Sequence, residues 1–269
     1  GTYNAKITIG KDAQEFVNLS VNPMDASSVG SHEINSKVEA RQPSGHDNST
    51  ELPKGTHEDA KDSLNALFSS DADYEVKGAN GSATITMNGG EDARDVARAF
   101  NLATGATGVT ASAITRLKIV SVSVAESNHF SFTLQGREEN ASVVNASIPD
   151  KNDLTTLKDA INSVTSNTGI VADLVNNKSS ILLVQSEGYD VIIGDLKSKS
   201  ILMGSSSMIV DTVEKNITGK LIDSNNRVNL AGYHQQGPGL NPGELDSVAV
   251  VGQVTLSSSK AFSITPGHG

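Results

Sequence analysis

The chain carries one stretch of its sequence twice, and this repeat limits the folds it can adopt more than any other feature. The first copy reads VARAFNLATGATGVTA at 96–111, and the second reads LKDAINSVTSNTGIVA at 157–172. Gly108 and Gly169 are separated by 61 residues, and at this offset five further pairs are identical: Ala99/Ala160, Asn101/Asn162, Thr104/Thr165, Thr107/Thr168 and Ala111/Ala172. A fixed period indicates that one supersecondary unit occurs twice.

Each copy predicts an amphipathic helix that ends near a glycine. Apolar residues recur at spacings of three and four, which places them on one helical face and predicts that the face lies on a sheet. Asp92 and Asp153 precede the two helices, where a carboxylate can accept a bond from a free backbone N–H. The residues that define the repeat are Asp92, Val96, Phe100, Asn101 and Gly108 in the first copy and Asp153, Leu157, Ile161, Asn162 and Gly169 in the second.

Strand patterns surround both predicted helices. The first copy is preceded by 73–78 and 82–87, joined by Ala-Asn-Gly-Ser, in which Asn-Gly is expected to supply the positive φ angles of a tight hairpin. The second is preceded by FSFTLQ and SVVNASI around the turn GREEN. Two strands are expected after each helix: 108–113 and 117–124, then 169–175 and 180–186. The predicted fold class is α+β, mainly antiparallel β, with repeated strand-strand-helix-strand-strand units and helices packed on sheets.

The remaining sequence predicts shorter elements. A hairpin is expected from 5–9 and 15–21, and a helix from 57–68. Loops are expected at 35–56 and 238–244, where Pro and Gly interrupt the pattern. Further strands are expected at 189–196 and near 207–213, 217–222, 247–256 and 260–265.

Composition excludes several function classes. A formal charge of −10 argues against nucleic-acid binding, because such proteins gather Lys and Arg on one face. The absence of Cys excludes disulfides and thiolate metal sites. Neither a signal peptide nor a membrane-spanning helix is predicted, since no long apolar run occurs.

No catalytic or metal-binding motif is predicted, and the chain is expected not to be an enzyme and to hold no cofactor. HEDAK at 57–61 begins like a zinc-protease H-E-x-x-H helix, but Lys61 replaces the second His. The six His have no spacing typical of a metal site. Asp71 and Asp73 alternate like calcium ligands, but the Gly and closing Glu of an EF-hand loop are absent, so a turn is favoured.

The segments LKDAINSVTSNTGIVADLVNNKSSILLVQSEGYDVIIGDL and DVARAFNLATGATGVTASAITRLKIVSV resemble the flagellin motif named for its Ile-Asn pair. That pair is Ile161-Asn162 in the second copy and Phe100-Asn101 in the first, which diverges in having Phe. The flanks GTYNAKITIG and VVGQVTLSSSKAFSIT are also similar to flagellin. The resemblance covers roughly 1–30, 73–200 and 247–265, whereas 31–72 and 200–245 match no known pattern.

The resemblance implies the variable, surface-exposed central part of a bacterial flagellin. It implies an extracellular filament location after export through the flagellar type III apparatus, other flagellin subunits as partners, and possible O-glycans. It also implies base segments at 1–31 and 247–269 that lead to filament-core helices, and two outer subdomains at 32–126 and 127–246 that contain the two copies. Without those core helices, the chain alone is expected to be monomeric.

Two alternatives remain open from the sequence. One is a surface module that binds a carbohydrate or host ligand, for which Tyr189 and Tyr233 are the candidate contact residues. The other is the filament cap, which is similar in carrying the same motifs. The ending GQVTLSSSKAF favours flagellin over the cap.

Overall fold

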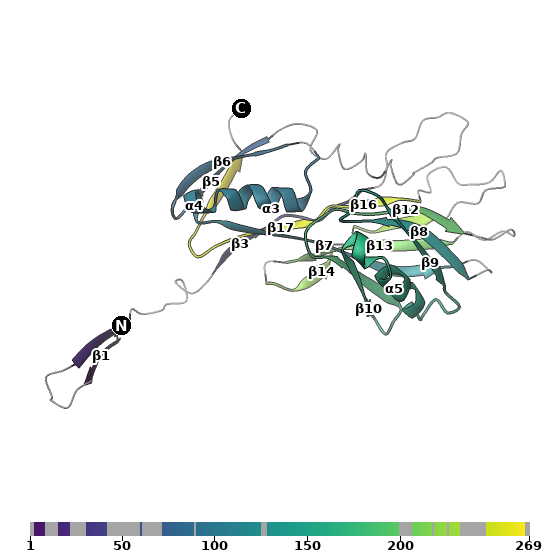
Figure 1. The fold of residues 1–269 in the computed structure, drawn as a ribbon, viewed down its shortest axis with the longest axis horizontal. Helices are drawn as coiled ribbons and strands as arrows, with labels where there is room; N and C mark the ends of the chain where they lie inside the picture. Colours follow the sequence, from purple (N-terminus) through teal and green to yellow (C-terminus); the bar gives the residue numbers. More distant parts are fainter. Residues whose placement is uncertain are drawn as a thin grey trace.

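The computed structural model in Figure 1 describes residues 3–8, 16–21, 31–41, 60, 72–88, 90–124, 128–198, 206–216, 218–224, 226–231 and 246–266. Its helices are α3 (Ala93–Leu102), α4 (Thr104–Thr107), α5 (Thr155–Asn162) and α6 (Thr165–Thr168). Its strands are β1 (Tyr3–Thr8), β2 (Phe16–Val21), β3 (His32–Asn35), β4 (Ala40–Arg41), β5 (Ala72–Gly78), β6 (Gly81–Met87), β7 (Thr110–Ser123), β8 (His129–Gln135), β9 (Ser142–Ser147), β10 (Ile170–Val175), β11 (Ser180–Gln185), β12 (Val191–Ser198), β13 (Ser207–Lys215), β14 (Leu221–Asp223), β15 (Val228–Ala231), β16 (Val248–Val250), β17 (Gln253–Ser258) and β18 (Ser263–Pro266).

The predicted fold class is confirmed: the chain is α+β and mostly antiparallel sheet, with a few short helices. The hairpin expected near the start is present, because β1 pairs antiparallel with β2. The helix expected at 57–68 lies outside the described residues apart from Ala60, which is helical and buried against Ile192 and Ala249. None of the helices in the described ranges is long and apolar enough to cross a membrane.

The first packing unit, which we call the first unit, contains the first repeat copy. Its hairpin β5–β6 pairs with β18, and the start of β7 pairs with β17, which in turn pairs with β3. Helix α3 contacts both layers and lies between β5–β6 and β7–β17 in Figure 1. Strands β17 and β18 come from the segment expected to form the base, and they complete the two sheets of this unit.

The second unit contains the second copy and is larger. Its hairpin β8–β9 belongs to a five-stranded sheet of order β4-β16-β12-β8-β9. The facing layer runs β10-β11-β7-β13-β14, so β7 takes part in both units. Helix α5 contacts β9 and β10, which are the edge strands of the two layers. The helix therefore closes one open side of this β-sandwich, as α3 does in the first unit.

Two hydrophobic cores correspond to the two units. The smaller core gathers Val76, Ile85, Phe100, Val254 and Leu256 with their neighbours around α3. The larger core holds Phe130 and Phe132, whose rings meet edge to face with centroids 5.9 Å apart, together with many Ile, Leu and Val side chains. The low aromatic content is thus offset by aliphatic packing, in which every buried methylene contributes about 0.8 kcal/mol.

Both copies differ from their expected plan in the helix, which is divided into α3 and α4 in the first copy and into α5 and α6 in the second. The first copy also differs in its strands. The strands expected at 108–113 and 117–124 are a single continuous strand, β7. In the second copy, Asn176, Asn177 and Lys178 have positive φ angles of 52°, 54° and 72° and turn the chain between β10 and β11. The equivalent first-copy positions are Thr115, Arg116 and Leu117, which include a β-branched residue and favour an uninterrupted strand.

Several smaller expectations also required correction. Strands β3, β4 and β15 were not expected, and β4 lies inside the loop expected at 35–56. The strand expected at 247–256 is divided into β16 and β17. The β5–β6 hairpin is present, but of Asn80 and Gly81 only Gly81 has a positive φ, at 145°. The loop residues Ala79 and Asn80 keep negative φ, so the turn is not the type I′ turn that Asn-Gly favours.

Candidate functional site

The residues shared by the two repeat copies form the same hydrogen-bonded arrangement in both copies. In the second copy, the Asn162 amide donates from Nδ2 to the Ala172 carbonyl at 2.9 Å and accepts from the Ala172 N–H at 2.8 Å. In the first copy, Asn101 makes the same two bonds to Ala111, at 2.9 and 2.8 Å. One side chain at the end of each helix thus holds both backbone groups of one strand residue.

The repeated threonines extend this connection. Thr165 Oγ1 donates to the Ile170 carbonyl at 2.7 Å, and Thr104 Oγ1 donates to the Val109 carbonyl at 2.8 Å. The second threonine of each copy, Thr168 or Thr107, donates to the carbonyl four residues earlier and accepts from the N–H two residues later. These bonds satisfy the backbone where each helix turns into its strand, so the motif fixes the turn from both sides.

The repeated glycines end the helices in the left-handed conformation. Gly108 has φ 75° and ψ 12°, and Gly169 has φ 68° and ψ 8°. The Gly169 N–H donates to the Thr165 carbonyl at 2.8 Å, and the Gly108 N–H donates to the Thr104 carbonyl at 2.7 Å. This is the helix-ending geometry for which glycine is favoured, because a Cβ atom is strained there.

A second pair of glycines, not singled out in the sequence, supports the same turn from the preceding hairpin. A Cβ atom added to Gly136 would lie 2.2 Å from the Thr168 carbonyl oxygen, and one added to Gly78 would lie 2.1 Å from that of Thr107. The next residue in the second copy, Arg137, donates its backbone N–H to the same Thr168 carbonyl at 2.8 Å. The close approach of hairpin and turn therefore requires glycine.

This arrangement protects the edge of a sheet. Strand β10 is the edge strand of its layer, and Asn162 supplies to Ala172 the two bonds that a further strand would make. On the other side of α5, Thr156 Oγ1 donates to the Ser147 carbonyl of edge strand β9 at 2.6 Å. An edge whose backbone groups are already bonded is a poor template for pairing with another chain.

The other repeat residues anchor the helices. Asp92 is the N-cap of α3, and its carboxylate accepts from the Asp95 N–H at 2.8 Å. Asp153 accepts from the Thr155 N–H at 3.0 Å, but Leu154 stands between it and the first helical residue. Leu157 and Ile161 are fully buried in the larger core. Phe100 is buried in the smaller core, and Val96 is partly buried against it.

The hydrogen bonds around Asp153 lower its pKa. The largest contribution comes from the Thr155 hydroxyl, followed by the Thr155 N–H, with a smaller contribution from Lys178. An ionised Asp153 is therefore the form that accepts the two bonds from Thr155 just before α5, and protonation at low pH weakens these bonds.

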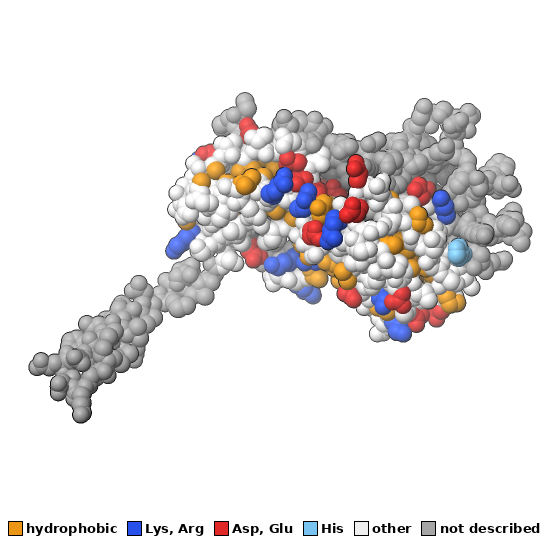
Figure 2. All heavy atoms as spheres, in the orientation of Figure 1, with side chains coloured by type: hydrophobic (Ala, Val, Ile, Leu, Met, Phe, Trp, Pro, Cys, Tyr) orange, Lys and Arg blue, Asp and Glu red, His pale blue; other side chains and the backbone are white. Residues whose placement is uncertain are grey.

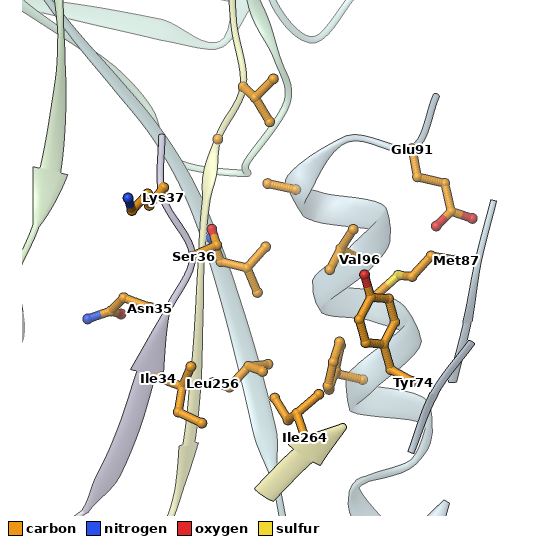
Figure 3. Close-up of a pocket in the computed structure, with 15 residues that line it drawn as sticks. Ile34, Asn35, Ser36, Lys37, Tyr74, Met87, Glu91, Val96, Leu256 and Ile264 are labelled. Carbon is orange, nitrogen blue, oxygen red and sulfur yellow. The ribbon is translucent and has the colours of Figure 1, made fainter. Parts of the chain in front are cut away.

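An apolar groove lies beside α3 in the first unit. Its volume is about 290 Å³, and Val96 and Phe100 of the helix face the β3–β17 strand pair across it. Figure 3 shows Ile34, Leu256 and Ile264 gathered at one end of the groove and Glu91 toward the other. Glu91 Oε1 accepts from Asn88 at 2.6 Å, while its Oε2 is buried without a partner among the described residues. The lining is mainly hydrophobic, with a few polar side chains among which Lys37 and Glu91 are charged.

Of the two tyrosines considered for ligand binding, the structure describes only Tyr189. The Arg94 guanidinium lies 4.2 Å from the centroid of the Tyr189 ring, so one face of this ring is already covered. Tyr233 lies outside the described residues. On the face shown in Figure 2, acidic and basic side chains lie close together with hydrophobic side chains scattered among them.

Comparisons with known proteins add little to this geometry. No protein-family model matches the sequence, and no curated protein matches it. Among solved structures, the flagellar cap protein FliD from Helicobacter pylori is similar over 92% of this chain and 97% of that chain, with 13% sequence identity and a TM-score of 0.23. A TM-score this low places the chain in no fold family.

Proposed function

We propose that the chain forms the outer, surface-exposed part of a bacterial flagellin. In this role it is a structural protein, exported through the flagellar apparatus, that is displayed on the filament and contacts neighbouring subunits. The observation that carries the proposal is the doubled Asn-x-x-Thr-x-x-Thr-Gly motif. The residues that resemble flagellin are the same ones that make matching hydrogen bonds in both copies.

The geometry suits a protein that displays a surface rather than one that performs a reaction. Each copy closes one side of a β-sandwich with a helix and bonds the backbone of the neighbouring strand edge. Subunits packed at high density along a filament need folded edges that do not pair with one another indiscriminately. Repetition of one supersecondary unit also extends the outer part of the protein, because the second copy forms its core on the same plan as the first.

Immunogold microscopy of the source bacterium tests this function. Antibodies raised against the purified chain are expected to label flagellar filaments along their whole length. Labelling restricted to the filament tip would favour the cap protein, and cells whose filaments carry no label would contradict the proposal. Antibodies absorbed beforehand with the purified chain provide the control.

We also predict that the chain is monomeric by itself. The flagellin proposal assigns polymerisation to core helices outside the two units, so the outer part should lack that contact. Sedimentation velocity at increasing protein concentration is expected to give one species of about 28 kDa. Filaments formed by this chain alone would show that assembly does not depend on those helices.

A further inference from the structure

The two units meet at a small, tightly packed junction. We define the junction as the N-terminus of α3 with Asp92, Arg94 and Asp95, the loop 188–190 between β11 and β12, and Gly252 between β16 and β17. The Arg94 N–H donates to the Gly188 carbonyl at 3.2 Å, and the Arg94 side chain covers Tyr189. The loop is also held by the Thr115 hydroxyl, which donates to the Tyr189 carbonyl at 2.6 Å.

Packing at the junction leaves little room for displacement. A Cβ atom added to Gly188 would lie 2.3 Å from the Cβ of Ala113, and one added to Gly252 would lie 2.8 Å from the Cβ of Ala93. Both glycines therefore let the loop 188–190 and the connection before β17 approach the first unit closely. A group that becomes charged in this space therefore has little room for local rearrangement around it.

Asp190 is such a group. Its Oδ1 is buried without a hydrogen-bond partner in the described part of the chain. The charged groups around it come mainly from the N-terminus of α3. The Asp92 and Asp95 carboxylates repel its negative charge, while the Arg94 guanidinium contacts Tyr189 and donates to Asp95 at 3.2 Å and has its Nε buried without a hydrogen-bond partner in the described residues. The connection before β17 contributes only the Gly252 N–H, which bonds to the Asp190 carboxylate.

We propose that Asp190 is a proton-dependent latch between the two units. In its neutral form the carboxyl group fits the junction, and the loop 188–190 stays packed between α3 and Gly252. In its ionised form the buried charge faces two further carboxylates and forms no ion pair within the described residues, and the junction loosens. The rigidity of the two-unit assembly is thereby coupled to the pH of the surrounding medium.

The direction of the pH effect follows from the pKa of Asp190. Burial, as the largest cause, and the Asp92 charge raise this pKa to about 7, against a smaller lowering by the Gly252 N–H. In the opened junction the carboxyl should titrate near the ordinary aspartate value of roughly 3.9. Between these values the closed junction holds a proton that the open one has released. The closed form therefore loses stability as pH rises from about 4 to about 7, and levels off above.

Two NMR measurements on the whole chain test the latch. A titration that follows the side-chain carboxyl carbon of Asp190 is expected to show a midpoint near 7. Hydrogen exchange of the Arg94 and Gly252 amides, corrected for the intrinsic pH dependence of exchange, should show protection that falls up to roughly tenfold per pH unit in this window.

Matched variants separate the latch from general pH effects. Asp190→Asn removes the charge at nearly constant volume, and its junction amides should keep their protection from pH 5 to 8. Asp173→Asn, in the exposed part of β10, should retain the wild-type pH dependence. A midpoint near 4 for Asp190, or equal pH dependence in wild type and Asp190→Asn, would overturn the proposal. If the variant does not fold, the titration of the wild-type carboxyl decides alone.

Discussion

Replacing Asn162 by Ala is expected to destabilise the second unit by about 3 kcal/mol. The substitution removes both side-chain bonds to the backbone of Ala172. Because Ala172 is only 1% exposed, water reaches its N–H and C=O poorly and cannot readily replace the lost partner. Each buried polar group left unsatisfied costs roughly 1–3 kcal/mol. Chemical denaturation should show a lower transition midpoint with an unchanged slope, which identifies a loss of stability rather than a change of the unfolded state.

The first copy provides the matched control. Asn101→Ala removes the same two bonds at the same distances, but Asn101 is exposed and Ala111 is only partly buried. Water can replace the lost partner there, so we expect a cost of about 1 kcal/mol. Equal losses for the two variants would show that burial of the strand edge does not determine the contribution of the motif.

Asn162→Asp separates the two halves of the interaction. Aspartate keeps an oxygen that accepts from the Ala172 N–H, but it cannot donate to the Ala172 carbonyl, so two oxygens face each other. We expect this variant to recover no more than part of the stability lost in Asn162→Ala, and to recover most of it at a pH low enough to protonate the new carboxyl.

The sequence predicted those parts of the fold that depend on neighbouring residues. The β5–β6 hairpin was placed correctly from its strand patterns, although its turn is not the expected type, and the helical segments that end at Gly108 and Gly169 follow from capping chemistry that acts over a few residues. The repeat offset of 61 residues also singles out Asn101 and Asn162, which have the same spacing as Gly108 and Gly169. The offset does not reveal the role of these side chains, because the strand to which they bond is specified only by folding.

The missed features depend on contacts between distant segments. Residues 115–117 favour an uninterrupted strand, but the partners of β7 cannot be read from its local pattern: β17 pairs with its first part, and β11 and β13 pair with the remainder. The sequence pattern did not single out Asp190, because its neighbours in sequence do not reveal that Asp92 and Gly252 lie around it in the fold. Long-range burial, rather than residue type, makes this carboxyl unusual.

The same distinction explains why the sequence did not single out Gly136, although a Cβ atom there would lie 2.2 Å from a backbone oxygen. In the sequence it begins the turn GREEN and looks like an ordinary turn glycine. In the fold it lies against the backbone of a turn more than thirty residues later, as the position of Thr168 shows. Its requirement comes from the approach of two backbones, which only the assembled unit creates.

Gly136→Ala is accordingly expected to lower the stability of the second unit by about 3 kcal/mol. The added Cβ would meet the Thr168 carbonyl oxygen at 2.2 Å, a backbone atom that cannot turn away as a flexible side chain could. The clash can be relieved only if the β8–β9 hairpin moves away from the turn at Thr168. This movement also strains the 2.8 Å bond from the Arg137 N–H to the Thr168 carbonyl. Overpacking of this kind costs roughly 1–3 kcal/mol before the bond is counted. Gly78→Ala, at 2.1 Å from Thr107, should do the same to the first unit.

Gly105→Ala is the control for both glycine variants, since a Cβ atom there meets nothing within 4 Å. Gly105 lies in the exposed α4 turn, where Ala restricts the unfolded chain and is expected to raise stability by up to about 1 kcal/mol. In both thermal and denaturant unfolding, the transition midpoint should therefore rise for Gly105→Ala and fall for Gly136→Ala. A mild effect at Gly136 would mean that hairpin and turn are not in contact in solution, and that the repeat motif does not hold the helix to its unit from both sides.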